Sequence, residues 1–299
     1  MWSEQTIALI HAACVEDLGD AGDITSALLP ARTQAATARI APREAGVICG
    51  LALIDAILAV FGTRLGQTVT FEPAQRGSVR WQDGDPVEPG DVVGTLRGPA
   101  AAVLAIERTL LNFLGRMSGV ATHTRRHVDA ARAGNPDVQV LDTRKTLPGW
   151  RELDKYAVRA GGGTNHRHGL YDAILIKDNH LAGVGVERLA GTLFDMLNRK
   201  PPQTAFVEVE VDTLEQLREV CKIVGVDIVL LDNFPLDDLR RAVDLRDELG
   251  LRGKLALEAS GGVTLDTIGD IAATGVDRIS VGALTHAARW LDIGLDRDA

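Results

Sequence analysis

The stretch AFVEVEVDTLEQLREVCKIVGVDIVLLDNF, residues 205–234, decides the fold, because it contains two apolar runs with a helical pattern between them. Valine, isoleucine and leucine dominate residues 205–212 and 227–234, as in strands that are buried on both faces of a sheet. Asp212 or Thr213 can cap a helix between these runs. Apolar residues recur behind this cap at helical spacing: Leu214, Leu217, Cys221 and Val224. A strand, a helix and a strand at this spacing predict a parallel βαβ unit with a right-handed crossover.

The same rhythm continues through the second part of the chain. Six apolar runs recur there: VQVLDTRK (138–145), DAILIKDNH (172–180), AFVEVEVD (205–212), DIVLLDNF (227–234), KLALEASGG (254–262) and DRISVGALT (277–285). Helical patterns separate most of them, with Pro148, Pro235 and Thr264 each suited to begin one. A closed eight-fold barrel usually needs about 250 residues, so this part has room for only six or seven units. We therefore expect an incomplete or seven-stranded α/β barrel.

The first third of the chain has a different pattern of expected helices and strands. Helical patterns over residues 3–18 and 52–61 flank short strand-like pieces, and residues 69–99 are short alternating runs separated by turn signals. Such a segment is typical of a small β-sandwich. It contains no lysine to which a carrier domain of that kind could attach its cofactor, so we interpret it as a structural layer. We expect three parts: a mixed α+β, sandwich-like N-terminal domain (1–115), an α/β barrel domain (116–285) and a helical C-terminal tail (286–299) packed back on the first domain.

The composition is that of a globular protein with an acidic balance. The 299 residues include 32 basic and 41 acidic side chains, and the net charge is -9. This balance argues against a general nucleic-acid binder or a protein bound to anionic membranes. Three cysteines have no metal-ligand spacing, so we expect free thiols in a reducing compartment: Cys14, Cys49 and Cys221. The first residues, MWSEQTIALI, do not resemble a secretory signal, and we expect a cytoplasmic protein.

Polar residues follow nearly every strand of the expected barrel. The strand ends are Thr143-Arg144-Lys145, Lys177-Asp178-Asn179, Glu208 and Glu210, Asp232-Asn233, Glu258 with Ser260-Gly261-Gly262, and Gly282-Ala283. The carboxyl ends of parallel strands converge on one mouth of a barrel, which is where such folds place their active sites. These residues therefore predict a shared functional mouth.

The cations at this mouth predict an anionic ligand. Four of them accompany His166: Arg144, Lys145, Arg167 and Lys177. Guanidinium groups bind carboxylate or phosphate bidentately, and lysine adds a point charge. For His166 and His168 the alternative is a loop histidine that is satisfied locally, and the neighbouring Arg167 weakens that alternative for His166.

Glycines and acids at the same mouth predict a phosphate and a metal ion. Gly261, Gly262 and Gly282 leave backbone N–H groups available beside helix N-termini, which suits a phosphate. Glu210 and Asp232 can offer oxygen ligands to a hard divalent cation. The mouth as a whole is therefore suited to a polyanion that is bound together with a metal.

Ordered motifs extend far beyond the mouth. The densest are Leu141-Asp142-Thr143-Arg144-Lys145-Thr146, Asn165-His166-Arg167, Gly169-Leu170-Tyr171-Asp172 and Ile176-Lys177-Asp178-Asn179-His180. Others are residues 22–26, 107–112, 208–212, 231–233, 258–262 and 281–285. Together they resemble the quinolinate phosphoribosyltransferase family over nearly the whole chain. His168 departs from the pattern, where an apolar residue is expected, and so does Ala259, where serine is usual; neither departure removes a cation or an acid of the mouth.

The resemblance implies a Mg2+-dependent reaction of quinolinate with 5-phosphoribosyl 1-diphosphate. The products would be nicotinate mononucleotide, diphosphate and carbon dioxide. The implied quinolinate-binding residues are Arg108, Thr143, Arg144, Lys145, His166, Arg167 and Lys177. Those implied for phosphoribosyl diphosphate are Lys145, Lys177, Glu210, Asp232, Ser260, Gly261, Gly262, Gly282 and Ala283. Lys145, Glu210 and Asp232 are the implied catalytic residues, and the two acids would also hold Mg2+, directly or through water.

The resemblance also implies a homodimer, in which Arg108 reaches the site of the partner subunit. Without the resemblance, an arginine in the middle of a helix is most simply a solvated or salt-bridged residue. Assembly beyond the dimer stays open.

Two related functions are the alternatives. One is a homologous protein encoded with molybdenum-transport genes, in which we expect the Lys177–His180 block to be missing. That block is intact here. The other is a transferase that uses nicotinate without decarboxylation, and the surplus of cations favours a dicarboxylate over it.

Overall fold

The computed structural model describes residues 1–297 and shows two compact units. The barrel unit consists of residues 126–145 and 163–286. The N-terminal unit consists of residues 1–125 and 146–162, together with the described residues from 287 onward. Helix α3 (Ala100–Gly134) contributes to both, so the domain boundary expected at residue 115 falls inside an unbroken helix.

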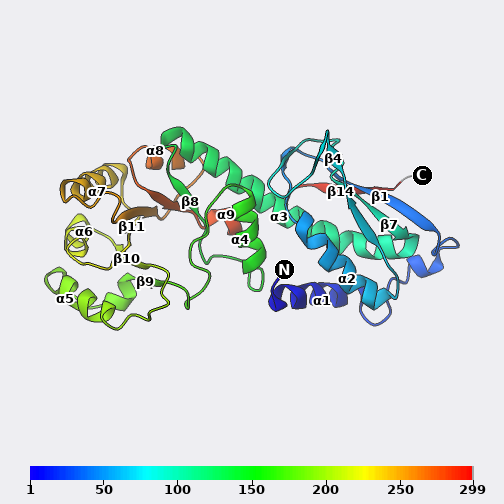
Figure 1. The fold of residues 1–299 in the computed structure, drawn as a ribbon, viewed down its shortest axis with the longest axis horizontal. Helices are drawn as coiled ribbons and strands as arrows, with labels where there is room; N and C mark the ends of the chain where they lie inside the picture. The colour runs from blue at the N-terminus through cyan, green and yellow to red at the C-terminus, as the bar shows by residue number, and fades with distance from the viewer. Residues whose placement is uncertain (298–299) are drawn as a thin grey trace. The chain divides into compact units, whose positions relative to one another are not determined.

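The barrel unit is built on a six-stranded parallel sheet (Figure 1). In spatial order the strands are β8 (Gln139–Leu141), β13 (Arg278–Ser280), β12 (Ala256–Ser260), β11 (Ile228–Asp232), β10 (Val207–Val211) and β9 (Ile174–Ile176). Each lies within one of the six apolar runs of the sequence. One isolated parallel bridge, Leu141–Thr164, extends the ladder at β8, and no strand pairing among residues 1–297 joins it to β9. The prediction of an incomplete α/β barrel is confirmed.

Helices connect the strands of the barrel unit. They are η3 (Asp178–Leu181), α5 (Val186–Leu197), α6 (Leu214–Val220), α7 (Leu236–Glu248), α8 (Ile268–Ala272) and α9 (Ala283–His286). In Figure 1, α5 to α8 follow one another along the outside of the strands. Thr213 caps α6 as predicted, because its hydroxyl accepts the N–H of Gln216. Val224 does not continue the helical apolar face predicted from its spacing: α6 ends before the turn at Gly225 (φ 98°), and Val224 is 96% exposed.

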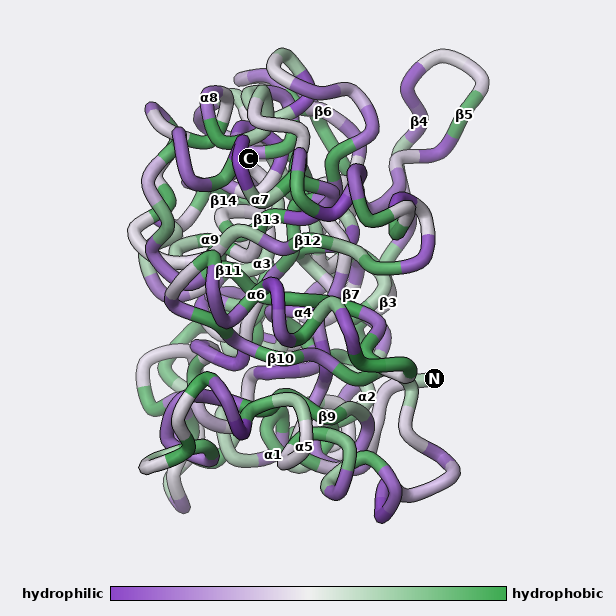
Figure 2. The backbone as a smooth tube through the Cα atoms, turned by 90° about the vertical axis from the view of Figure 1, so that its left-hand side faces the viewer, coloured by the Kyte–Doolittle hydropathy of each residue, from purple (hydrophilic) through white to green (hydrophobic). Residues whose placement is uncertain are grey.

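The N-terminal unit combines helices with a four-stranded antiparallel sheet. The sheet order is β14 (Ile293–Arg297), β1 (Ala35–Pro42), β7 (Gly94–Pro99) and β3 (Thr70–Pro73). Two short pairs accompany it: β2 (Gly46–Val47) with β6 (Pro86–Val87), and β4 (Gln75–Arg76) with β5 (Val79–Arg80). The other helical elements are α1 (Glu4–Leu18), η1 (Ser26–Leu28), η2 (Leu51–Leu53), α2 (Ile54–Leu65) and α4 (Arg151–Ala160). The β4–β5 hairpin projects outward in Figure 2, and its residues are exposed.

The C-terminal tail forms a strand where we expected a helix. Strand β14 pairs antiparallel with β1, with Ile293 opposite Pro42 and Leu295 opposite Ile40. The helical prediction is wrong because these apolar residues alternate with a period of two, and pairing satisfies the backbone at the edge of β1. The end of the expected tail, residues 298–299, lies outside the described residues.

Helix α3 packs closely against this tail within the N-terminal unit. The backbone N–H of Leu291 donates to the carbonyl oxygen of Gly115 at 3.0 Å. A Cβ at Gly119 would lie 2.2 Å from the carbonyl oxygen of Arg289. Glycine at position 119 therefore permits the backbones to approach. None of the helices in residues 1–297 combines the length and the apolar character that crossing a membrane requires.

Replacing Gly119 by alanine should lower the free energy of unfolding by roughly 1–3 kcal/mol, the usual cost of overpacking. Gly191→Ala in α5 is the matched control, because its Cβ would meet no atom within 4 Å. Alanine favours a helix interior over glycine by up to about 1 kcal/mol, so the control should be stabilised. Denaturant unfolding measures both variants, and effects of the same sign would contradict the close contact at Gly119.

Candidate active site

A cavity of about 820 Å3 lies at the carboxyl ends of the barrel strands. All but one of the residues predicted from the sequence to bind the substrates line it: Thr143, Arg144, Lys145, His166, Arg167, Lys177, Glu210, Asp232, Ser260, Gly261, Gly262, Gly282 and Ala283. Arg108 is the exception. It is exposed on α3 in the N-terminal unit and does not line this cavity. His168 is also exposed and does not line it.

The polar strand residues reach the cavity because they share one face of the sheet. In the parallel register, Glu210 lies beside Leu230, Leu230 beside Glu258, and Asp232 beside Ser260. Side chains two residues apart on a strand point to the same side. The alternation of acids with valine in the stretch VEVEV therefore turns the acids of β10 inward and its valines toward the helices.

Two carboxylates, one buried and one half-buried, hold the loop that carries His166 and Arg167. Asp142 is completely buried; it accepts the backbone N–H of His166 at 2.9 Å and the side-chain amide of Asn165 at 2.5 Å. Asp172 accepts the backbone N–H groups of His168 at 2.7 Å and Gly169 at 2.9 Å. Burial raises the pKa of Asp172, but these hydrogen bonds outweigh it and the pKa is lowered. The loop is thus fixed by hydrogen bonds to two acids.

Arg167 brings a positive charge to a site with little solvent. Only 8% of this residue is exposed, and Nη1 donates to the carbonyl oxygen of Ala173 at 3.3 Å. Burial and then the neighbouring cation Arg144 lower the pKa of Arg167, against the opposing effects of Glu208 and Asp172. Two guanidinium groups that repel each other across the cavity wall would be stabilised by an anion between them.

A buried ionic cluster forms the floor of the cavity. Nε2 of His166 lies 2.8 Å from Oε2 of Glu208 and 3.5 Å from Oε1 of Glu258. Nε of Arg278 donates to the other oxygen of Glu258 at 2.7 Å. Both glutamates are completely buried. The edge of the His166 ring meets Phe206, with 5.5 Å between ring centroids.

The two glutamates control the charge of His166. Burial lowers the pKa of His166, but Glu208 and Glu258 outweigh burial and raise it to about 9. One contact opposes this: the backbone N–H of Arg167 donates to Nδ1 at 2.8 Å, which requires an unprotonated Nδ1. The carboxylates outweigh this contact, because a neutral ring would leave the two buried glutamates with Arg278 as their nearest cation. Burial and Glu258 raise the pKa of Glu208, whereas at Glu258 the contacts with His166 and Arg278 outweigh burial and lower it.

This cluster was only partly visible in the sequence. Glu208 and Glu258 were read as strand-end acids of the mouth, and Arg278 was not singled out. The period of two in VEVEV carried a usable signal, since it places Glu208 one layer below Glu210 on the same face. Nothing in the sequence indicated that His166 would turn toward these acids.

Lys177 and Glu210 form an ion pair across the mouth, from Nζ to Oε2. Asp232 accepts a hydrogen bond from Nδ2 of Asn233 at 2.7 Å. Glu210 and Asp232 thus present oxygen atoms on neighbouring strands, which is the donor type that Mg2+ prefers. His166, Glu208 and Glu258 also have ligand atoms within 4.8 Å of one another. That group fits Mg2+ poorly, because His166 and Arg278 already supply its positive charge.

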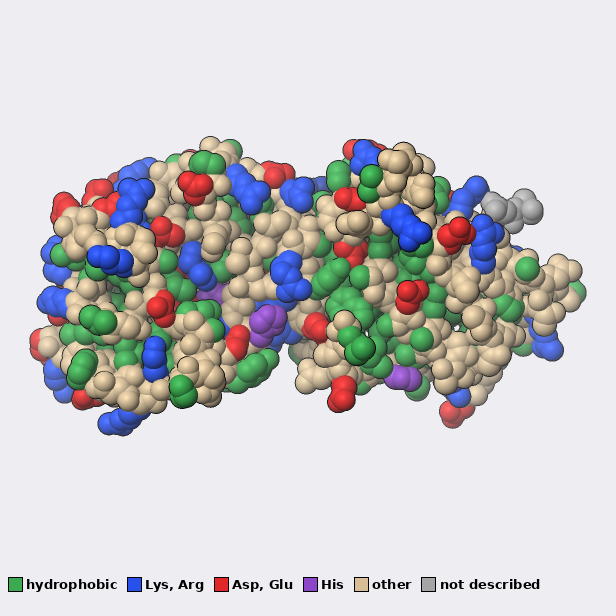
Figure 3. All heavy atoms as spheres, in the orientation of Figure 1, with side chains coloured by type: hydrophobic (Ala, Val, Ile, Leu, Met, Phe, Trp, Pro, Cys, Tyr) green, Lys and Arg blue, Asp and Glu red, His purple; other side chains and the backbone are tan. Residues whose placement is uncertain are grey.

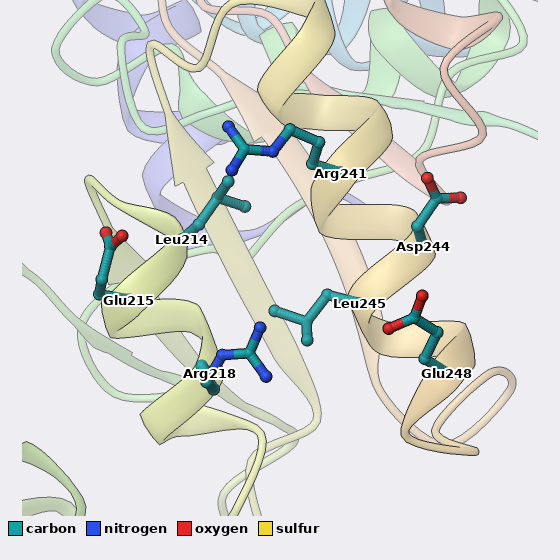
Figure 4. Close-up of a pocket in the computed structure, with 7 residues that line it drawn as sticks. All are labelled: Leu214, Glu215, Arg218, Arg241, Asp244, Leu245 and Glu248. Carbon is teal, nitrogen blue, oxygen red and sulfur yellow. The ribbon is translucent and has the colours of Figure 1, made fainter.

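A second, smaller hollow of about 310 Å3 lies between α6 and α7 (Figure 4). Its charged residues are all exposed and of both signs: Glu215, Arg218, Arg241, Asp244 and Glu248. Figure 3 likewise shows cationic and acidic side chains interspersed over the face in view. The concentration of cations distinguishes the barrel mouth from this hollow.

The His166 cluster predicts a loss of stability at high pH. Its pKa of about 9 lies above the ordinary value of 6.5, so the stabilisation is fully present below pH 6.5 and is lost as the pH rises through 9. The difference corresponds to about 3 kcal/mol. Unfolding free energies between pH 6 and pH 10 should therefore fall more steeply for the wild type than for His166→Asn. His11→Asn, at an exposed position, should keep the wild-type slope; equal slopes for all three proteins would refute the charged cluster.

Two family models together match most of the chain. The model described as quinolinate phosphoribosyl transferase, N-terminal domain, matches residues 23–118, and the one described as its C-terminal domain matches residues 120–296. The second match alone covers more than half of the chain.

Curated relatives and solved structures agree with these models. The nicotinate-nucleotide pyrophosphorylase [carboxylating] of Mycobacterium leprae is 43% identical, over 96% of this chain and 95% of that protein. The probable enzyme of the same name from Bacillus subtilis is 39% identical, over 96% and 92% of the two chains. The crystal structure of NadC from Streptococcus pyogenes has a TM-score of 0.85 at 34% identity, over 99% and 98%. By sequence and by fold, the chain belongs to the quinolinate phosphoribosyl transferase family.

Proposed function

We infer that this chain is a decarboxylating quinolinate phosphoribosyltransferase of NAD biosynthesis. It transfers the phosphoribosyl group of 5-phosphoribosyl 1-diphosphate to quinolinate and yields nicotinate mononucleotide, diphosphate and carbon dioxide. Family membership and the relatives' names support this reaction. The observation that carries it is one cavity that gathers four cations, the three acids Glu210, Asp232 and Glu258, and a glycine-rich edge.

The cationic side of the cavity is suited to the two carboxylates of quinolinate. We assign Arg144, Arg167, Lys145 and Lys177 to them, with the Thr143 hydroxyl nearby. A hydrogen bond to a charged group contributes roughly 1.5–3 kcal/mol. We assign His166 to the same site as a charge rather than as a hydrogen-bond donor, because its ring nitrogens face Glu208 and the backbone of Arg167.

The opposite side of the cavity is suited to phosphoribosyl diphosphate. We assign Glu210 and Asp232 to the ribose hydroxyls, and the backbone of residues 260–262 and 282–283 to the 5-phosphate. Lys145 and Lys177 serve both substrates, because each lines the cavity that we assign to both. Gly261 and Gly262 have φ values of 93° and 58°, which glycine adopts without strain. A Cβ at Gly261 would lie 2.1 Å from Oδ1 of Asn233, so this turn has no room for a side chain.

Mg2+ is the cofactor that we propose, held by Glu210 and Asp232 directly or through water. The ion would neutralise charge on the departing diphosphate. Lys177 already pairs with one oxygen of Glu210. Bound substrate would therefore draw Lys177 toward its own negative charge and release that oxygen.

The chemistry follows from where the charges lie. Arg144 and Arg167 orient quinolinate so that its ring nitrogen faces C1 of the ribose, while Lys145 stabilises negative charge that develops on the departing group. Glu210 and Asp232 stabilise the positive charge that grows on the ribose. After the nitrogen attacks, the pyridine ring carries a positive charge. The positive nitrogen then stabilises the carbanion that remains on the neighbouring ring carbon when the adjacent carboxylate leaves as carbon dioxide, and a proton from water converts this carbon to C–H.

Diphosphate release with phosphoribosyl diphosphate and Mg2+ tests this function. Release should occur with quinolinate, be matched by carbon dioxide and be absent with nicotinate. Release with nicotinate alone would overturn the dicarboxylate assignment. If folded protein released no diphosphate with either quinolinate or nicotinate, the result would favour the molybdenum-associated homologue.

Lys145→Ala should reduce kcat by about 100- to 1,000-fold, as does the loss of one group that stabilises transition-state charge. Lys222→Ala is a control at an exposed lysine that pairs with Glu219. Its kcat should equal that of the wild type. A kcat of Lys145→Ala equal to that of the wild type would show that Lys145 has no catalytic role.

We also propose a homodimer in which Arg108 of the partner subunit completes the quinolinate site. Its exposure and its absence from the cavity of its own chain support this arrangement. Buried or half-buried free thiols at Cys14, Cys49 and Cys221 support a reducing, cytoplasmic location.

Mixing two inactive variants tests the shared site. Arg108→Ala and Lys145→Ala should each be impaired, but a mixed dimer would contain one site with both residues intact. Random reassortment of a two-fold dimer would thus restore about a quarter of the wild-type sites. Quinolinate turnover after joint refolding measures the recovery, and no gain over the separate variants would argue against an Arg108 that acts across the interface.

A further inference from the structure

The Lys145 backbone is anchored by a threonine outside the set of residues assigned to the substrates. Thr285 in α9 is completely buried, and its hydroxyl donates to the carbonyl oxygen of Lys145 at 2.8 Å. The same hydroxyl lies 3.2 Å from the carbonyl oxygen of Gly282. Its single hydrogen is therefore shared between two chain segments that are more than a hundred residues apart in sequence.

The side chain of Lys145 is guided by the same turn. A Cβ built on Gly282 would lie only 2.8 Å from Cδ of Lys145, so the alkyl chain passes directly over this glycine. On the other side, the backbone N–H of Lys145 donates to Oγ1 of Thr143 at 3.0 Å. Lys145 is itself exposed, so burial does not fix it. Its position depends on these polar contacts and on the space above Gly282.

We propose that Thr285 is a positioning residue that holds Lys145 over the β13–α9 turn and so aligns the ammonium group with the bound phosphoribosyl diphosphate. This inference rests on the proposed catalytic role of Lys145. Displacing a reacting group by about 1 Å can cost 100-fold in rate. A lost anchor should therefore appear in kcat, while groups that bind the substrates independently keep KM near its original value.

Thr285→Val and Thr285→Ser in the full-length protein form the matched pair. Valine keeps the shape but removes the donor, whereas serine keeps the hydroxyl. We expect Thr285→Val to lower kcat by about 10- to 100-fold, with KM for both substrates within about threefold and with Thr285→Ser close to the wild type. Equal kcat values for the valine and serine variants would overturn the proposal, and so would a loss confined to KM.

A double-mutant cycle with Lys145→Ala separates positioning from general damage. If Thr285 acts through Lys145, adding Thr285→Val to Lys145→Ala should cause almost no further loss. If the fold-losses in kcat caused by the two substitutions multiplied in the double variant, Thr285 would act independently of Lys145. Full turnover by Lys145→Ala would refute the proposed role of Lys145 itself, whereas an impaired Lys145→Ala with an unaffected Thr285→Val would refute only the positioning inference.

Gly282→Ala provides a second variant in case Thr285→Val does not fold. The added methyl group meets the flexible end of Lys145, so the fold should tolerate it while the ammonium group moves. We expect kcat to fall at least tenfold in the wild-type background, and little further in the Lys145→Ala background. An undiminished kcat would contradict the guidance of Lys145 by this turn.

Discussion

Two carboxyl groups buried side by side in the barrel unit are the constraint on which its active site depends. Glu208 and Glu258 are wholly removed from water, and a buried carboxylate costs several kcal/mol unless it is paired. His166 and Arg278 supply the compensating charge. Because His166 must reach these acids, its loop has to pass over the floor of the cavity, and Arg167 is carried to the wall with it. The position of the substrate cations is thus a consequence of neutralising the floor.

The mouth above this floor is organised in opposing charges before any ligand arrives. Lys177 is paired with Glu210, while Arg144, as a like charge, helps to lower the pKa of Arg167. The Lys177–Glu210 ion pair has to open when Lys177 binds the substrate. The repulsion between Arg144 and Arg167 persists until an anion binds near them. Both features favour an anionic ligand, since only an anion can relieve the repulsion and occupy the freed ammonium group. The resting electrostatics of the mouth therefore act in the same direction as direct contacts with an anion.

Structural features could be predicted from the sequence where their residue pattern has a local physical cause. The six strands were found because apolar β-branched runs bounded by polar residues have few other interpretations, and the mouth residues followed from parallel topology. Val224 and the tail were missed for local reasons that compete with periodicity: the turn at Gly225 ends the helix early, and β1 offers an edge to which residues 293–297 can bond. The contacts among His166, Glu208 and Arg278 were out of reach, because they join segments whose proximity only the folded sheet creates. Thr285 was likewise visible as a motif residue, but its hydrogen-bond partner was not.

The long sequence separation between β1 and β14 determines when the N-terminal sheet can be completed during synthesis. Strand β1 ends at residue 42, yet β14 starts only at residue 293, and the barrel segments lie between them in the sequence. At synthesis rates of about 5–20 residues per second, roughly 10–50 s pass between the synthesis of β1 and that of β14. During that interval the outer edge of β1 exposes unpaired backbone groups, which is the situation in which strands join foreign chains. A segment made long after β1 therefore covers the edge of this sheet, and until then the nascent N-terminal unit is open to wrong pairing at that edge.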